Sequence, residues 1–248
     1  ILHLFPRREF FEAVEATRAD RGAKGFSCWE QFVAMLFCQL GQAHSLREIC
    51  GGLASCLGKA RHLGIQKAPK RSTLAYANEH RPWQLYEKLF YQILGRCRQL
   101  QFGKRAFRFK NRLFSLDASL IPLCASLFDW AKYRQTKGAV KLHLLLDHEG
   151  YLPVFACITT GKIHEVRIAR MLNFPAGSIV VVDRGYVDFK LFRSWDEAGV
   201  FFVTRQKGNA HYRVVEDRAI PKNRSILSDQ LIELEGYYSH KNYPGSLR

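Results

Sequence analysis

The stretch Ser178-Ile179-Val180-Val181-Val182-Asp183 places a carboxylate directly after an unbroken apolar run. A second stretch, Arg112-Leu113-Phe114-Ser115-Leu116-Asp117, ends in the same way earlier in the chain. Short apolar runs of this kind predict strands that are buried in a sheet. If the two strands are neighbours, Asp117 and Asp183 lie side by side at one edge of that sheet. Paired carboxylates suit Mg²⁺ binding and phosphodiester chemistry.

The order of elements after residue 112 predicts an α/β fold. Three strands come first, a helix follows, and then strand, helix and strand alternate; we expect them at 113–120, 140–146, 152–158, 164–172, 179–182, 189–198 and 200–203. This is the order of the ribonuclease H-like fold, a mixed sheet flanked by helices. In that order the first and fourth strands are adjacent, so Asp117 and Asp183 are expected to meet.

The first hundred residues predict helices. The pattern Ser27-Cys28-Trp29-Glu30 is a capping box, and it opens a core helix of about 14 residues whose inner face would reach Leu40. The pattern Ser45-Leu46-Arg47-Glu48 repeats the signal and opens a second helix. The pair Gly51-Gly52 weakens the middle of that helix and predicts close packing against a neighbour. A further helix is expected over residues 83–100.

Basic residues are concentrated in the segment 59–112. It holds 14 of the 38 Lys and Arg residues but only 2 of the 22 Asp and Glu residues, and therefore contributes +12 to the net charge of +16. Such a concentration favours contact with a phosphate backbone, and we expect double-stranded DNA as the partner. A solvated basic face, an acidic protein partner and an anionic membrane surface are the alternatives.

A helix beginning near Ser72 carries part of this charge at its N-terminus. Lys70, Arg71, Ser72 and Thr73 stand where backbone amides, the helix dipole and cationic side chains all favour a phosphate. The helix, loop, helix layout is typical of a helix-turn-helix reader, although an ordinary helical hairpin would show the same pattern. We therefore predict a helical DNA-binding domain over 1–105, followed by the α/β domain over 106–248.

The remaining composition excludes several classes of protein. No run of 18 apolar residues and no signal peptide occurs, which predicts a soluble, cytoplasmic protein without membrane contact. The seven cysteines are odd in number and form no Cys-x-x-Cys pair, so reduced core cysteines are favoured over zinc sites or disulfides. His143 and His148 have a zinc-like spacing, but no paired cysteines stand near them.

Three short sequences carry a family resemblance. They read Ser115-Leu116-Asp117-Ala118-Ser119, then Val182-Asp183-Arg184-Gly185-Tyr186-Val187-Asp188-Phe189, and then Phe202-Val203-Thr204-Arg205-Gln206-Lys207-Gly208. Together they resemble the bacterial DDE insertion-sequence transposases of the family called insertion sequence four. The stretches 5–10 and 21–26 share the resemblance, so it covers nearly the whole chain. On pattern alone, each aspartate would serve equally well as a turn former or a helix cap.

The resemblance implies a metal site and a reaction. In that family three acidic residues bind two Mg²⁺ (or Mn²⁺) ions, and the first two residues would be Asp117 and Asp183. One ion activates water or a 3′-hydroxyl, and the other stabilises the leaving oxygen. The partners would be the terminal inverted repeats of an insertion element and a target DNA, bound by a homodimer in the DNA complex.

Three cationic residues stand close to the predicted carboxylates. Arg184 would contact a phosphate in bidentate fashion, or would form an ion pair with Asp183 or Asp188. Arg205 and Lys207 leave the last strand at the same edge of the sheet. They are predicted DNA contacts, with a solvated loop as the alternative.

The sequence departs from the family in one respect. The third carboxylate lies in a frame Tyr-x2-Arg-x3-Glu-x6-Lys, and no Tyr from residue 186 onward has Arg three places later. The segment 209–248 instead resembles the start of the β-rich insertion that precedes the glutamate helix, with alternating Tyr212, Val214, Ile232 and Leu234. We therefore expect a C-terminally truncated transposase that cannot complete strand transfer as written. A non-catalytic DNA-binding inhibitor and a stand-alone ribonuclease H-like nuclease are the alternatives.

Overall fold

The computed structural model describes residues 1–248 except for 57, 101–108, 124–131, 135–136 and 221–224. The chain separates into two compact units, Ile1–Leu100 and Gln101–Arg248. The boundary predicted at 105/106 lies outside the described residues. None of the described helices is both long enough and apolar enough to cross a membrane.

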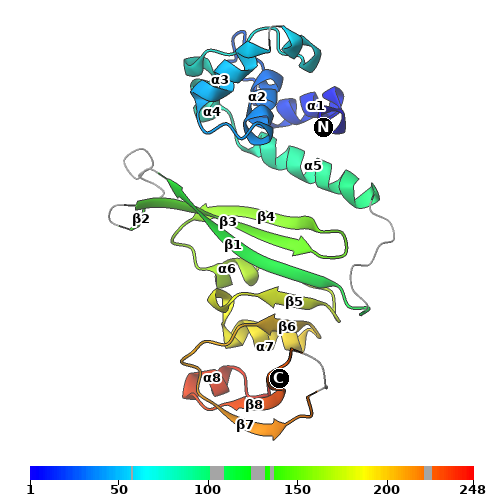
Figure 1. Ribbon diagram of the computed structural model, residues 1–248, viewed down its shortest axis with the longest axis vertical. Helices are drawn as coiled ribbons and strands as arrows, with labels where there is room; N and C mark the ends of the chain where they lie inside the picture. Colours follow the sequence, from blue (N-terminus) through cyan, green and yellow to red (C-terminus); the bar gives the residue numbers. More distant parts are fainter. Residues whose placement is uncertain (57, 101–108, 124–131, 135–136, 221–224) are drawn as a thin grey trace. The chain divides into compact units, whose positions relative to one another are not determined.

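The first unit is helical, as Figure 1 shows. Its α-helices follow one another without an intervening strand in the described residues; they are α1 (Arg7–Thr17), α2 (Cys28–Leu40), α3 (Leu46–Ser55), α4 (Arg71–His80) and α5 (Gln84–Leu100). Two short 3₁₀ turns, η1 (Leu2–Leu4) and η2 (Lys59–Leu63), complete the unit, and η2 lies between α3 and α4 in the chain. The order helix, turn and helix over α3, η2 and α4 agrees with the predicted layout.

Capping residues define the starts of α2 and α3. The Ser27 hydroxyl accepts the Glu30 amide at 3.1 Å, and the Glu30 carboxylate accepts the Ser27 amide at 2.8 Å, which is the predicted capping box. Ser45 accepts the Glu48 amide in the same way at 3.2 Å. The prediction that Leu40 faces the core is wrong: its side chain is 59% exposed because α2 extends beyond the core at its C-terminal end.

The core of the first unit is aromatic where α1 and α2 meet. Phe10 of α1 packs on Trp29 edge to face, with ring centroids 4.9 Å apart, and lies 5.3 Å from the Phe32 ring. The three side chains are almost completely buried. Aromatic pairs in this geometry add stability beyond the area they bury, so these ring contacts stabilise the packing of α1 against α2.

Gly52 of α3 lies against the Phe37 ring of α2. A Cβ atom at Gly52 would lie 2.7 Å from Cζ of Phe37, whereas one at Gly51 would meet nothing within 4 Å. We expect Gly52→Ala to lower the free energy of unfolding by about 1 kcal/mol, because the Phe37 ring must move. The matched change Gly51→Ala should raise it by up to about 1 kcal/mol, because Ala favours the helix. Urea denaturation measures both, and equal effects would contradict close packing at Gly52.

The second unit contains a mixed sheet of six described strands. The strands are β1 (Leu113–Leu123), β2 (Lys132–Arg134), β3 (Lys137–Asp147), β4 (Leu152–Thr160), β5 (Ile179–Val182) and β6 (Phe201–Thr204). They run in the order β2-β3-β1-β5-β6, and β4 pairs with the same edge of β3 as β2 does. The pairs β1/β3 and β3/β4 are antiparallel, whereas β1/β5 and β5/β6 are parallel. This confirms the predicted ribonuclease H-like order.

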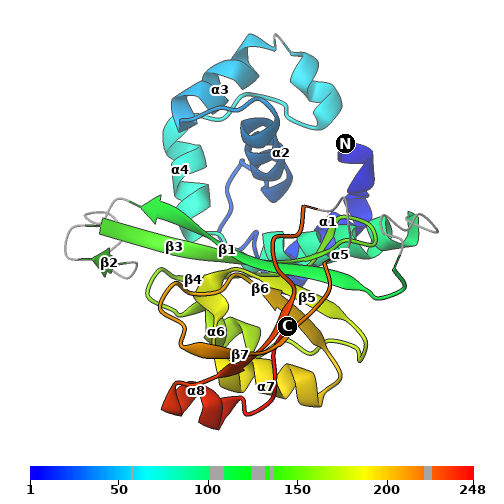
Figure 2. The same cartoon turned by 60° about the horizontal axis from the view of Figure 1, so that its bottom comes forward.

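Two helices cover one face of this sheet. Helices α6 (Glu165–Ala169) and α7 (Phe189–Glu197) lie together on that face in Figure 2. Alternate residues of β1 and β5 turn inward to meet them, and the cluster includes Phe114, Leu116, Val180, Val182, Val166, Phe192 and Trp195. The period of two in β1 and β5 is the ordinary alternation of a strand with one buried face.

Several element boundaries differ from the predictions: β3 begins at Lys137 rather than at residue 140, and β4 ends at Thr160 rather than at residue 158. Strand β2 was not predicted. Strand β1 continues to Leu123, three residues beyond the predicted end, because β3 pairs with it as far as Leu123. Helix α6 stops at Ala169 rather than at Leu172. The amides of Met171 and Leu172 donate to the carbonyls of Ile168 and Ala169, three residues earlier, so the chain tightens after the helix instead of extending it.

The segment after β6 forms a small second sheet. Strands β7 (Tyr212–Asp217) and β8 (Gln230–Leu234) pair antiparallel, and helix α8 (Tyr237–Asn242) follows. The alternating residues singled out in the sequence face one another, because Tyr212 pairs with Leu234 and Val214 pairs with Ile232. Tyr243 holds this segment to α7 through a hydrogen bond to Asp196 at 3.2 Å.

Candidate active site

The register of β1 and β5 brings the two predicted carboxylates together. The parallel pairs run from Leu113 with Ile179 to Leu116 with Val182, where β5 ends. Asp117 and Asp183 are the next residue on each strand. Neighbouring strands lie about 4.8 Å apart, so the two backbones are adjacent at this point. Both side chains are exposed.

Asp117 lies within β1 rather than at its end. The strand continues past it beside β3, where Leu144 is its antiparallel partner, while the β5 side is open because β5 has stopped. One carboxylate oxygen of Asp117 accepts the Ala118 amide at 2.8 Å. The second oxygen accepts no hydrogen bond from the described residues, so it is available to a ligand.

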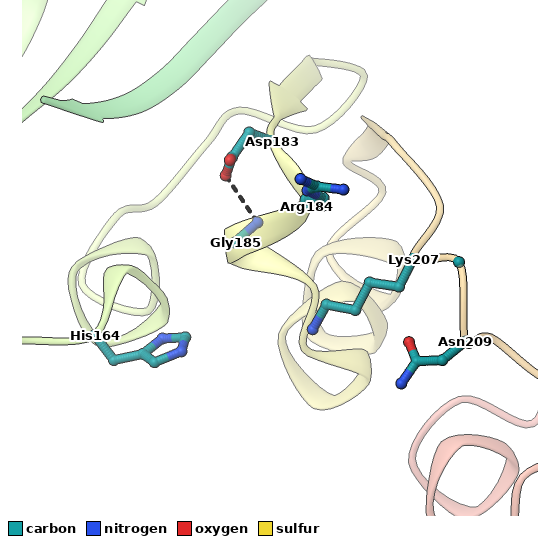
Figure 3. Close-up of a pocket in the computed structure, with 7 residues that line it drawn as sticks. His164, Asp183, Arg184, Gly185, Lys207 and Asn209 are labelled. Atoms are coloured by element: carbon teal, nitrogen blue, oxygen red, sulfur yellow. Dashed lines mark hydrogen bonds between the residues drawn. The ribbon is translucent and has the colours of Figure 1, made fainter.

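Asp183 is the cap of the short turn η4 (Arg184–Tyr186). Its Oδ1 accepts the Gly185 amide at 2.9 Å, the hydrogen bond drawn in Figure 3. The Thr204 hydroxyl donates to its backbone carbonyl at 3.3 Å. A Cβ atom on residue 185 would lie 3.0 Å from Asp183 Oδ1, so Gly at this position gives the carboxylate room.

Strand β6 ends at the same edge of the sheet as β5. Val182 of β5 pairs with Thr204 of β6, and Arg205 follows Thr204 directly. Arg205 therefore starts at the edge where Asp183 stands, and its side chain is exposed. The strand ends thus bring two carboxylates and one guanidinium to a common edge of the sheet.

An open pocket of about 490 Å³ lies beside Asp183. Its described lining residues are His164, Asp183, Arg184, Gly185, Lys207, Gly208 and Asn209, and they include neither Asp117 nor Arg205. Figure 3 shows His164 on the α6 side of this space, opposite Lys207 and Asn209. Within the described part of the chain Arg184 forms no ion pair, because Asp188 pairs with Arg170 instead at 2.9 Å. Arg184 and Lys207 are therefore available to an anion.

Two of the lining residues, His164 and Asn209, were not predicted as site residues. His164 is the cap of α6 and accepts the Val166 amide at 3.4 Å, and Asn209 follows β6 in a loop. A lone His before a helix and a loop Asn are common in any protein, so only the fold shows their place.

A partly buried ion pair lies on the helix-covered face of the same sheet. Lys141 of β3 donates to the Glu165 carboxylate at 2.6 Å and to the Ile163 carbonyl at 2.9 Å. Burial alone would raise the pKa of Glu165, but the hydrogen bond and charge of Lys141 lower it below the usual value. The charge of Glu165 is therefore already balanced within the protein.

The predicted DNA-contact residues of the first unit lie at the start of α4. Lys70 is the residue before the helix, and Arg71 and Ser72 begin it one residue earlier than predicted. Lys70, Arg71 and Ser72 are exposed, and Thr73 is half-buried. Among the residues described for this unit, neither Lys70 nor Arg71 forms an ion pair, so both charges are available to a partner.

Other basic residues of the segment 59–112 form hydrogen bonds and ion pairs within the protein. Arg81 donates to the Ser27 carbonyl at 3.0 Å and to the Gln31 side chain at 2.9 Å, and Arg96 pairs with Glu9. Arg112 pairs with Asp147 at 2.5 Å. The concentration of charge in the sequence therefore overstates the charge that is available to DNA.

The family "Transposase DDE domain" matches residues 108–243, which include both carboxylates and the whole described sheet. The chain belongs to this transposase family. A second match, over residues 1–66, is to a domain of unknown function. The resemblance to bacterial DDE insertion-sequence transposases is thereby confirmed.

Two curated relatives carry transposase names. "Putative transposase y4zB" of Sinorhizobium fredii is 30% identical over 154 residues, which cover 62% of this chain and 42% of the relative. "Probable transposase for insertion sequence element IS5377" of Geobacillus stearothermophilus is 26% identical over 165 residues, 66% of this chain and 43% of the relative. The chain thus spans less than half the length of these relatives.

One solved structure also aligns with the chain. It is a cryo-EM structure of a piggyBac transposase synaptic complex with hairpin DNA. The identity is 10% and the TM-score is 0.40, over 84% of this chain and 50% of that chain.

The donor atoms at the sheet edge fit the metal that transposases of this family are expected to use. Mg²⁺ prefers carboxylate oxygens and is often held by one or two carboxylates together with water and substrate phosphates. The exposed carboxylates Asp117 and Asp183 supply such donors. The described residues contain no group of three Asp, Glu, His or Cys side chains arranged to hold a metal. The pair therefore fits a magnesium site that is completed by other ligands.

Proposed function

We propose that this chain carries out DNA transposition as part of an insertion-element transposase, cleaving phosphodiester bonds at the element ends and transferring the strand to target DNA. The observation that supports this most is the register of β1 and β5, which makes Asp117 and Asp183 adjacent. The match of residues 108–243 to the transposase family supports the same reaction class.

Asp117 and Asp183 would hold the divalent ions, Mg²⁺ or Mn²⁺. When bound, these ions supply Lewis-acid activation of the attacking hydroxyl and of the leaving oxygen. The free oxygen of Asp117 and Oδ2 of Asp183 are the ligand atoms we assign, because the other oxygen of each side chain accepts a backbone amide. Those amides fix the orientation of both carboxylates before a ligand arrives.

Arg184, Arg205 and Lys207 would hold the DNA phosphates. Arg205 stands in line with the carboxylates, and Arg184 and Lys207 line the pocket next to Asp183. Guanidinium groups contact phosphate in bidentate fashion and remain charged at any working pH. Cations placed beside the carboxylates also offset the repulsion between them and the phosphate backbone.

The helical unit would bind the element ends. Lys70, Arg71, Ser72 and Thr73 present two unpaired cations and two hydroxyl groups at the N-terminus of a ten-residue helix. Phosphate binding at such a position gives affinity without sequence specificity. We propose a homodimer in the DNA complex, since an element has two ends that must be joined together.

Metal removal tests this function. The full-length transposase, incubated with DNA that carries the element ends, should cleave at those ends in Mg²⁺ and show no cleavage in EDTA. Separation of the products on a sequencing gel locates the cut. Cleavage that persists in EDTA, or no cleavage in either Mg²⁺ or Mn²⁺, would rule out the proposed reaction.

A second candidate function is suggested by the start of α4, where Lys70 and Arg71 are exposed. With this surface the chain would bind element ends without cutting them. It would then act as an inhibitor of active transposase. Addition of this chain to a cleavage reaction distinguishes the two: an inhibitor lowers the rate in proportion to the ends it occupies.

A further inference from the structure

The exposed face of α4 continues beyond the cations at the start of the helix. Leu74 and Ala77 belong to the core of the helical unit, where their side chains are 0% and 4% exposed. Ser72 and Tyr76 lie one turn apart on the exposed face, because residues i and i+4 of a helix lie above one another. Tyr76 is 63% exposed, so a large ring lies on the surface directly after the residues assigned to phosphate binding.

The Tyr76 ring is held in place by His80, one turn further along α4. The two rings stack with their centroids 3.8 Å apart and their planes inclined by 17°. Nδ1 of His80 lies 3.0 Å from the Tyr76 carbonyl oxygen, and because a carbonyl oxygen only accepts, this nitrogen donates the hydrogen bond. The imidazole and the phenol ring are therefore both fixed before any partner binds. Such preorganised groups lose little conformational entropy on binding.

The charges along this face indicate the kind of partner. Lys67, Lys70 and Arg71 are exposed and form no ion pair with the described residues, and the first acidic residue after them is Glu79 in the last turn of α4. The helix thus presents cations at its start and neutral side chains along its middle. Double-stranded DNA is complementary to this order, because its phosphates border the groove and its uncharged base edges lie within it.

We propose that Tyr76 determines sequence specificity, and that its ring contacts the C5-methyl group of a thymine in the major groove of the element end. This inference rests on the proposed function. Phosphate contacts from Lys70 and Arg71 would position α4 on the duplex without reading its sequence, so base contacts have to supply the specificity. Apolar groups recognise thymine by its methyl group, and the N-terminal part of a recognition helix is the part that reaches the bases.

The test compares Tyr76→Ala with wild type in the full-length transposase, on a duplex that carries an element end and on a duplex of scrambled sequence. The variant should bind the element end about tenfold more weakly, within the range for the loss of one base contact. Its binding to the scrambled duplex, and the slope of log K against log salt, should match wild type, because no phosphate contact is lost. Fluorescence anisotropy measures these quantities. The Tm should change little, since Ala favours the helix and the position is exposed.

A change in the DNA identifies the contacted group. Uracil differs from thymine only by the absence of the C5-methyl group, so each thymine of the element end is replaced by uracil in turn. At the contacted position the replacement should weaken wild-type binding about fourfold, roughly the effect of one buried methyl group. The same replacement should not weaken the binding of Tyr76→Ala any further. Tyr76→Phe keeps the ring and should behave as wild type at every position.

A second exposed tyrosine of the same unit provides the control. Tyr91 lies on α5 and is 41% exposed. Tyr91→Ala should leave the preference for the element end over the scrambled duplex unchanged. An equal loss of preference in both alanine variants would mean that the effect is not specific to the exposed face of α4.

Three results would overturn the inference. One is a Tyr76→Ala protein that keeps the wild-type preference for the element end, and another is a variant that binds both duplexes equally more weakly. The third needs no variant: no uracil replacement weakens binding by the wild-type protein. If wild type itself does not prefer the element end, the proposed end binding fails together with the inference. If wild type and Tyr76→Ala share the same preference, only the inference fails.

Discussion

Asp117→Asn or Asp183→Asn in the full-length transposase should lower Mg²⁺-dependent cleavage of element ends by at least about 1000-fold, which corresponds to roughly 4 kcal/mol of transition-state stabilisation. Asn keeps the size of the side chain but replaces a charged oxygen ligand by a neutral one. Both positions are exposed, so the fold should tolerate the change. Binding to the ends should be retained, because the predicted reader lies in the other unit.

The measurement is a cleavage time course together with a gel shift on the same DNA. Asp217→Asn is a matched control: this exposed carboxylate lies on β7 and accepts from Gln230 at 2.7 Å, away from the edge of the main sheet. It should cleave at the wild-type rate. If Asp117→Asn or Asp183→Asn cleaves at a rate within tenfold of wild type, the proposed role of that residue as a metal ligand is wrong.

The second large effect is expected on DNA binding. Lys70→Ala combined with Arg71→Ala should weaken end binding by about 10- to 100-fold at low salt, since two unpaired cations leave the start of α4. The slope of log K against log salt is negative, and its magnitude should decrease by about 1.8, or about 0.9 for each lost phosphate contact. Fluorescence anisotropy over a range of salt concentrations measures both quantities.

The control for this prediction removes the same charge elsewhere in the helical unit. Arg8 and Lys24 are exposed and lie outside the basic segment, and Arg8 pairs with Glu12 on the surface of α1. Arg8→Ala with Lys24→Ala should change the salt slope by less than half as much. Equal slopes for the two double variants would mean that net charge, and not the α4 start, determines binding.

Much of the fold could be predicted because its signals are local. The Ser27 and Glu30 capping box lies within the first turn of one helix, and the apolar run 179–182 is a complete strand. The predicted order of elements then limited the sheet to few topologies, because parallel crossover connections are right-handed and short. Adjacency of the strands that carry Asp117 and Asp183 was predictable for this reason.

The remaining features depend on distant partners. Strand β1 extends to Leu123 because β3 pairs with it, and no property of residues 121–123 alone requires this. Arg81 donates hydrogen bonds to the Ser27 carbonyl and the Gln31 side chain at the start of α2, which lies far away in the sequence. His164 and Asn209 line one pocket because α6 packs on the sheet to which β6 belongs.

The sequence by itself determined the transposase resemblance, the two carboxylates and the order of helices and strands, because these depend on residue type and on spacing along the chain. Only the tertiary structure decided which cations are available to a partner and that His164 lies beside Asp183 in one pocket. The physical reason is that burial and pairing are properties of neighbours in space. A local pattern sets the direction of a side chain, but packing sets its environment.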